Sequence, residues 1–226
     1  MPDRRPQVTA QKRYLEERKS LAPLDLRRRF EYIFESNLWG SEESRYGVGS
    51  ALLETEILRN QLPALLREIG ARSVLDLPCG DFRWFSEVEL GVPYIGADIV
   101  NQLVRANTDA FGSPDRRFVC LDLTRDALPE ADVVLCRDCL VHLSYANIRR
   151  ALANVKLSGA LFLLMTNFLS LERNDDIEDG DWRPLNFQLP PFSLKAPARI
   201  IVEHCTEAEG AYADKSLSLW RVSDLP

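Results

Sequence analysis

From residue 73 to residue 226, the chain alternates short apolar runs with segments of helix length. Each run is rich in Val, Ile, Leu or Phe and has the length of a strand. This alternation is typical of a mostly parallel sheet with helices on both faces. The sequence therefore predicts an α/β fold with a seven-stranded, mostly parallel sheet. The predicted strands are residues 73–77, 94–97, 117–121, 132–136, 160–165, 199–203 and 217–221.

The rest of the pattern predicts the helices and the domain organisation. A short turn around Glu209-Gly210 separates the last two strands, which predicts an antiparallel hairpin at one edge of the sheet. Helices are expected over 25–37, 51–68, 100–110 and 144–156, with Ser50 as the N-cap of the second. We expect a basic tail over 1–22 and a single domain over 23–226. That domain divides into a helical lid (23–70) and a core (71–226) with an active-site insertion (168–196).

The charge distribution limits the possible partners. A net charge of −6 argues against broad binding of nucleic acid, which needs a surface of Lys and Arg. The first thirty residues are an exception, interpreted as a solvated tail and helix face or, alternatively, as an arm that contacts a phosphate-bearing partner. Their cations are Arg4, Arg5, Lys12, Arg13, Arg18, Lys19 and Arg27, Arg28 and Arg29. No signal peptide or membrane span is recognisable, so a cytoplasmic protein is expected.

The loop after the first predicted strand is the most informative stretch. The strand ends in Asp76 and is followed by a tight turn with Pro78, Cys79, Gly80 and Asp81, and then by a segment expected to be helical. In an open α/β sheet, ligands bind beyond the carboxyl ends of the strands. The G-x-G-x-x-G pattern that seats a dinucleotide pyrophosphate is absent, and carboxylates would repel that group. They suit a cationic amino or sulfonium group better, which favours S-adenosylmethionine (SAM) over NAD.

This stretch resembles motif I of class I SAM-dependent methyltransferases, and the resemblance continues in register. Residues 94–98, 118–123 and 132–138 are similar to the second, third and fourth strands of that fold. The resemblance implies a Rossmann-like fold, SAM as cofactor, Asp98 on the ribose hydroxyls and Asp122 facing the adenine amino group. At position 78 this chain has proline, whereas many members of the family have glycine there. The cofactor-binding residues expected are Trp39, Ser50, Asp76, Pro78, Gly80, Asp98, Ile99, Asp122, Leu123 and Arg137.

A narrower resemblance covers nearly the whole chain. Residues 39–40, 47–50, 77–82, 137–144 and 180–186 resemble a mostly uncharacterised bacterial methyltransferase family, in which some members act on sugar hydroxyls. The resemblance implies a sugar or glycoside acceptor. The absence of an N-P-P-Y motif after the fourth strand argues against methylation of the amino groups of nucleic-acid bases or glutamine.

The segment after the fourth predicted strand carries the candidate catalytic residues. A hydroxyl acceptor needs a base or a metal to remove its proton. His142 lies four residues after Asp138, one turn along an expected helix, and Arg137 precedes them. His142 is interpreted as the base or, alternatively, as a buried core histidine. Asp138 could instead hold Mg²⁺. The further carboxylates that could serve such a site are Asp81, Asp175, Asp176, Glu178, Asp179 and Asp181.

The insertion after the fifth predicted strand is long and polar, as functional loops often are. Substrate-binding residues are expected at Asp81, Asp181, Trp182, Arg183 and Asn186, or the insertion is a structural plug. The sequence thus predicts a SAM-dependent O-methyltransferase for a small hydroxyl acceptor, which could form a homodimer. An RNA or protein methyltransferase, or a non-catalytic SAM-binding regulatory protein, remains an alternative.

Overall fold

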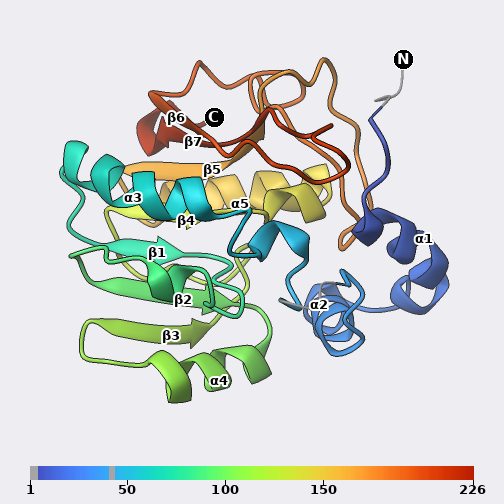
Figure 1. The fold of residues 1–226 in the computed structure, drawn as a ribbon, viewed down its shortest axis with the longest axis horizontal. Helices are drawn as coiled ribbons and strands as arrows, with labels where there is room; N and C mark the ends of the chain where they lie inside the picture. Colours follow the sequence, from blue (N-terminus) through green and yellow to red (C-terminus); the bar gives the residue numbers. More distant parts are fainter. Residues whose placement is uncertain (1–4, 41–43) are drawn as a thin grey trace.

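The computed structural model describes residues 5–40 and 44–226, and a seven-stranded sheet forms its centre (Figure 1). The strand order is β3-β2-β1-β4-β5-β7-β6. The predicted mostly parallel sheet and its antiparallel edge pair are confirmed, because β1 to β5 run parallel and β7 pairs antiparallel with both β5 and β6. The strands are β1 Val74–Asp76, β2 Tyr94–Asp98, β3 Arg116–Cys120, β4 Val133–Cys136, β5 Phe162–Phe168, β6 Arg199–Val202 and β7 Lys215–Arg221.

The direction of the chain reverses between β1 and β4. From β1 the chain moves outward through β2 to β3, and then returns to place β4 on the other side of β1. Loops that leave the carboxyl ends of β1 and β4 therefore diverge and leave a crevice between them, which is where open α/β sheets bind ligands.

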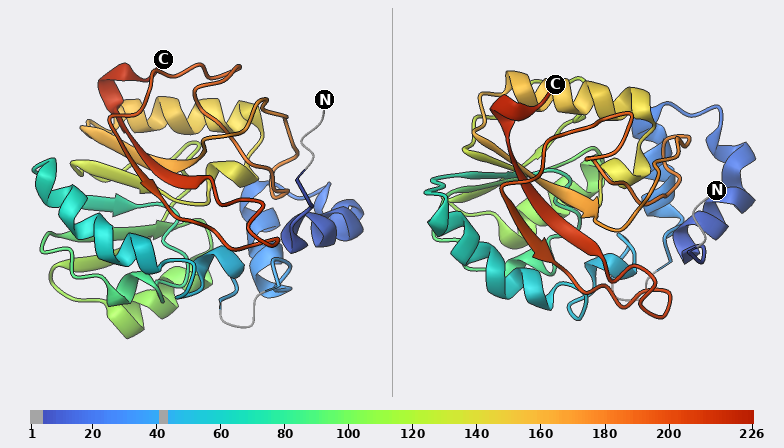
Figure 2. Two further views of the ribbon diagram at one scale, coloured as in Figure 1. Left: turned by 45° about the horizontal axis from the view of Figure 1, so that its top comes forward. Right: turned by 90° about the horizontal axis from the view of Figure 1, so that it is seen from above.

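Helices cover both faces of the sheet because neighbouring strand residues point to opposite sides. Val133 packs in the cluster formed with α3 Glu56–Glu68 and α4 Asn101–Phe111, while Val134 packs in the cluster formed with α5 Tyr145–Leu157. Figure 2 shows α3 and α5 on opposite sides of the sheet. Within the described ranges, no helix is long and apolar enough to cross a bilayer.

The N-terminal segment is more ordered than the tail expected over 1–22. It contains α1 Thr9–Leu21, which is followed by α2 Leu26–Glu35, and both helices lie beyond the carboxyl ends of the central strands (Figure 1). Tyr14 and Leu21 of α1 are fully buried against α2. Tyr14 and Leu21 are two helical turns apart. The buried face of α1 therefore has too few apolar residues for the sequence pattern to predict this helix. Residues 1–4, with Arg4, and residues 41–43 of the predicted lid loop lie outside the described residues.

Three other local predictions were wrong. Ser50 ends a 3-10 turn, Val48–Ser50, and α3 begins only at Glu56, so Ser50 is not its N-cap. The loops after β1 and β4 contain 3-10 turns, Phe85–Glu87 and Leu140–His142, where α-helices were expected. The connection between β6 and β7 spans residues 203–214 and is therefore a long loop. Buried side chains fix the loop after β1, because Phe82, Trp84 and Phe85 belong to the core cluster that contains the buried leucines of α3.

Candidate active site

A pocket, here called the main pocket, lies in the crevice beyond β1 to β4 and is closed on one side by α2. All ten residues expected to bind the cofactor line it: Trp39, Ser50, Asp76, Pro78, Gly80, Asp98, Ile99, Asp122, Leu123 and Arg137. They come from five separate segments of the chain. The structure thus brings the predicted set together around one cavity.

Two buried carboxyl groups form the floor of the main pocket. Asp76 accepts a hydrogen bond from the Tyr94 hydroxyl at 2.6 Å, and burial raises its pKa to about 7. Asp98 accepts the backbone N–H of Val100 at 2.9 Å through Oδ1, and burial raises its pKa to about 6. Its Oδ2 is buried without a partner of hydrogen-bond geometry in residues 5–40 and 44–226. An unsatisfied carboxylate oxygen at this depth is ready to accept hydrogen bonds from a ligand.

Asp122 lines the same pocket, but its carboxylate has local partners. Oδ1 accepts the N–H of Thr124 at 2.8 Å and its hydroxyl at 2.7 Å, and Oδ2 lies 3.4 Å from Arg125 Nε. Asp122 therefore shapes the turn after β3 as well as the pocket wall.

Tyr46 is a pocket residue that the sequence did not reveal. Gly80 has a φ of +57°, and a Cβ there would lie 3.3 Å from Tyr46 Cγ, so the ring rests on the glycine backbone. Burial and the nearby Asp98 carboxylate raise the pKa of Tyr46 well above its usual value. Tyr46 thus covers the loop after β1, and the expected lid contacts the pocket through this ring and Trp39.

His142 is held as a neutral imidazole. Its Nδ1 lies 2.8 Å from the backbone oxygen of Asp181, and Trp39 stacks on the ring at 4.3 Å. A carbonyl only accepts, so we assign the proton to Nδ1 and leave Nε2 as an acceptor. Burial lowers the pKa of His142 to about 4. His142 is therefore buried, as the alternative reading expected, and it also lines the main pocket as a base would.

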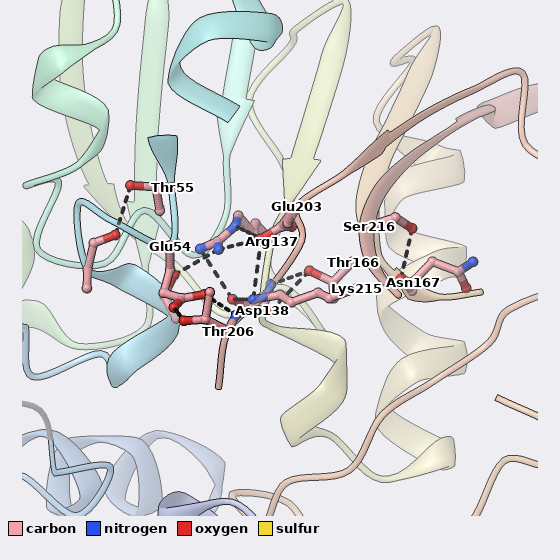
Figure 3. Close-up of polar contacts among 12 residues, drawn as sticks. Glu54, Thr55, Arg137, Asp138, Thr166, Asn167, Glu203, Thr206, Lys215 and Ser216 are labelled. Carbon is pink, nitrogen blue, oxygen red and sulfur yellow. Dashed lines mark hydrogen bonds and ion pairs between the residues drawn. The ribbon is translucent and has the colours of Figure 1, made fainter. Parts of the chain in front are cut away.

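Asp138 belongs to a buried ionic network with Arg137, Glu203 and Lys215 (Figure 3). Its Oδ2 lies 2.6 Å from Lys215 Nζ and 3.2 Å from Arg137 Nη1. Burial alone would raise the pKa of Asp138, but the two cations outweigh it and lower the pKa to about 2. The carboxylate therefore stays ionised and is a weaker base than His142, whose pKa is about 4, which favours His142 over Asp138 as the group that accepts a proton.

Arg137 positions other groups. Its guanidinium binds Glu203 Oε2 at 2.7 Å and the backbone oxygen of Gly49 at 2.8 Å, besides Asp138. A Cβ at Gly49 would lie 3.2 Å from Asp138 Oδ2 and 3.3 Å from Lys215 Nζ, so the loop backbone covers this ion pair closely. Arg137, predicted as a catalytic and cofactor-binding residue, holds the Gly49 loop and the Asp138 carboxylate in place.

A second cavity, here called the side pocket, adjoins the main pocket. Trp39, Tyr46, Asp138 and His142 line both. The remaining side-pocket residues are Val8, Ala10, Gly47, Val48, Gly49, Phe168, Trp182, Cys205, Glu207, Tyr212 and Lys215. The candidate base and its neighbouring carboxylate thus lie in a wall common to two cavities.

The expected substrate-binding residues separate into two groups. Asp81 lines the main pocket and accepts the Ser44 hydroxyl at 2.7 Å, and Trp182 lines the side pocket. Asp181, Arg183 and Asn186 line neither cavity.

Arg183 and Asn186 are buried in the insertion. Arg183 donates to the backbone oxygens of Leu140 and Leu143, and Asn186 donates to that of Leu171. Both residues fix the backbone of the insertion and the segment beside His142. Their contacts are those that the structural alternative expects, and substrate contact by these two residues stays a prediction.

The carboxylates proposed for Mg²⁺ do not converge. Asp138 is balanced by two cations, Asp81 binds Ser44, and Asp179 accepts from Ser144 and Asn147 at the start of α5. Within the described part of the chain, no three His, Cys, Asp or Glu side chains are grouped as metal ligands. The residues expected to hold magnesium do not fit that role.

Solved structures share this fold. NodS, an N-methyltransferase from Bradyrhizobium japonicum WM9 in complex with S-adenosyl-L-homocysteine (SAH), has a TM-score of 0.60 at 12% identity over 84% of this chain and 97% of its own. The 1,6-didemethyltoxoflavin-N1-methyltransferase of Burkholderia thailandensis has a TM-score of 0.59 at 17% identity, over 91% of this chain and 89% of its own. Human N-acetylserotonin methyltransferase in complex with SAM has a TM-score of 0.56 at 14% identity, with 96% of this chain and 62% of that one covered.

This is the class I methyltransferase fold. No family model and no curated protein matches the sequence. The identities establish the fold, while the expected bacterial family with sugar-methylating members stays a prediction.

The pKa values of Asp76 and Asp98 predict how ligand binding in the main pocket depends on pH. A ligand is bound best when both are ionised, because an ionised carboxylate accepts hydrogen bonds through both oxygens and attracts cationic groups. Their pKa values are about 7 for Asp76 and about 6 for Asp98. We expect the affinity for SAH, measured by calorimetric titration, to fall at least about tenfold from pH 8 to pH 5 as both become protonated. Asp98→Asn should remove the part of this dependence that has its midpoint near pH 6. An affinity that is constant over this range would contradict the assignment.

Proposed function

We propose that this protein is a SAM-dependent O-methyltransferase that methylates a hydroxyl group of a small acceptor. The observation that carries the proposal is the common wall of the two pockets. One cavity contains the residues expected to bind SAM, the other offers space for an acceptor, and Asp138 and His142 lie between them.

The main pocket has the chemistry that SAM requires. The unsatisfied Oδ2 of Asp98 can accept a ribose hydroxyl. The ionised form of Asp76 would favour the cationic groups of the cofactor. When bound, SAM supplies an electrophilic methyl group. Most of the rate gain in such a displacement comes from alignment of the reacting atoms.

His142 is suited to accept the proton of a hydroxyl. Its Nδ1 proton is fixed by the Asp181 carbonyl, so Nε2 carries the lone pair. The stacked Trp39 ring restricts rotation of the imidazole. Because burial lowers its pKa, His142 stays neutral at physiological pH and needs no prior loss of a proton.

The N-terminal segment argues for a small acceptor and against RNA or protein. Val8 and Ala10 form part of the side-pocket wall, and Val8 is buried. Arg5, at the start of the proposed basic arm, pairs with Asp214 at 3.0 Å. Arg29 donates to the backbone oxygen of Asp179 at 2.8 Å. These cations bind the protein itself, and the segment that carries Val8 would exclude a polymer from the side pocket.

Calorimetric titration with SAH tests the cofactor assignment. We expect micromolar binding that Asp98→Ala reduces at least about 100-fold. The substitution removes the buried carboxylate that accepts the ribose hydroxyls, and these hydroxyls then lie in the pocket without a hydrogen-bond partner. Asp109→Ala, at an exposed position of α4, is the matched control and should bind like the original protein. Absence of SAH binding to the unmodified protein would refute the proposal.

Release of SAH from SAM, measured over a panel of phenols, glycosides and alkyl alcohols, tests the catalytic part. SAH binding without turnover on any compound would favour the regulatory alternative over the enzyme.

A further inference from the structure

The side pocket has an aromatic wall and a grouped set of polar side chains. Phe168 at the end of β5, Trp182 in the insertion and Tyr212 in the β6–β7 connection pack edge to face, with ring centroids 5.1 to 6.1 Å apart. Trp39 and Tyr46 add two further rings from the N-terminal region, and Val8 and Val48 add aliphatic surface.

The polar side chains of the side pocket lie close enough for their charges to shift one another's pKa values. His142 and Glu207 are both influenced by the charges of Asp138 and Lys215. Arg183 and Asn186, two of the five residues expected to bind the substrate, lie outside this pocket and donate to backbone oxygens. A ligand that matches this pocket therefore has a flat apolar body and its polar group at one end.

Lys215 supplies a donor at that polar end. An ammonium group carries three N–H donors. The ion pairs with Asp138 at 2.6 Å and Glu203 at 3.5 Å engage two of them, and Lys215 also lines the side pocket. The pocket thus combines an acceptor, His142 Nε2, with a cationic donor, Lys215 Nζ. This pair can take the proton of a hydroxyl and stabilise the charge that develops on its oxygen.

We propose that the acceptor is an aryl hydroxyl, a phenol whose ring lies among Trp39, Phe168, Trp182 and Tyr212 and whose oxygen lies between His142 and Lys215. This inference rests on the proposed function. The oxygen gives its proton to His142 Nε2 and forms the bond to the methyl carbon. The electron pair of the breaking C–S bond stays on sulfur, which leaves SAH.

The acidity of the two partners supports this class of acceptor. Burial lowers the pKa of His142 to about 4, so its imidazole is a weak base. A phenol resembles the tyrosine side chain, with a pKa of about 10. An alkyl hydroxyl is close to water, at about 16. Proton transfer to His142 is therefore far less unfavourable from a phenol than from a sugar.

The test compares 2-naphthol with decahydro-2-naphthol, its saturated counterpart, and with methyl α-D-glucopyranoside. Each is titrated into the SAH-saturated protein, and methyl transfer from SAM is followed by mass spectrometry. We expect 2-naphthol to bind and to be methylated, at least about tenfold better than either control. The absorption spectrum should show that bound 2-naphthol ionises at a lower pH than the free compound.

Two variants test the residues in this arrangement. Lys215→Met should raise the pH at which bound 2-naphthol ionises and weaken its binding about tenfold or more. Lys195→Met, at an exposed ion pair with Asp224, is the matched control and should leave both unchanged. Because Lys215→Met alters a buried network, Trp182→Leu provides a second variant. It should weaken naphthol binding while SAH affinity stays within about threefold.

The outcomes separate this inference from the proposed function. If SAH binds but 2-naphthol does not, or if the glucoside or the saturated alcohol binds or reacts equally well, the aryl-hydroxyl inference is wrong. In that case the methyltransferase assignment still stands on its own tests. If SAH itself does not bind, the proposed function fails.

Discussion

Replacing His142 by glutamine should lower kcat by about 100- to 10,000-fold, the usual contribution of a general base. The expected result follows from the neutral ring, whose Nδ1 faces the Asp181 carbonyl and whose Nε2 is left as the acceptor, in a residue that lines both pockets. Initial rates at saturating SAM, measured with the acceptor that the methylation panel identifies, provide the value. SAH affinity should change by less than about threefold, because the proposed cofactor anchors are carboxylates.

The chain contains a matched control for this variant. His204 is the only other histidine and is exposed, so His204→Gln should leave kcat unchanged. A His142→Gln enzyme that keeps its rate within threefold would show that the base lies elsewhere or that alignment alone drives transfer.

The second large effect is on stability. Glu203 is almost fully buried and lies 2.7 Å from Arg137 Nη2 and 3.5 Å from Lys215 Nζ. Glu203→Gln leaves Asp138 alone to balance two buried cations. Removal of one partner from a buried ion pair typically costs about 3–5 kcal/mol. We therefore expect the free energy of unfolding, measured by urea titration, to fall by about this amount.

An exposed ion pair provides the comparison. Arg199 and Glu68 lie 2.5 Å apart, but both side chains are more than half exposed. Pairs of this kind contribute about 0–1 kcal/mol, so Glu68→Gln should hardly change the unfolding curve. Equal effects of the two substitutions would mean that the network around Asp138 does not stabilise the fold.

The strands and the main pocket could be predicted because their signals are local. An apolar run followed by Asp76 or Asp98 is visible in the sequence, and parallel strands bring such ends to one edge of a sheet. Each predicted strand has its counterpart in the structure. The loops after β1 and β4 were mistaken for helices because their buried aromatic and apolar side chains resemble a helical pattern.

The side pocket depends on long-range pairing, which no local pattern shows. Lys215 is 77 residues from Asp138, and the antiparallel register that pairs Lys215 with Phe168 brings it to the site. Glu203 and Tyr212 arrive through the β6–β7 connection in the same way. Arg183 and Asn186 have the chemistry of ligand-binding residues, and only their backbone partners reveal that they hold the insertion together.

The two pockets share Trp39, Tyr46, Asp138 and His142, but the rest of their walls comes from different parts of the chain. Val8 in the N-terminal segment, Trp182 in the insertion and Tyr212 in the β6–β7 connection line only the side pocket, while α2 and the loops after β1 to β3 line only the main pocket. Substitutions at Val8, Trp182 or Tyr212 therefore change one cavity without touching the other. Acceptor preference can diverge in such an arrangement while the cofactor site is retained, which makes these three positions the natural starting points for directed evolution of selectivity.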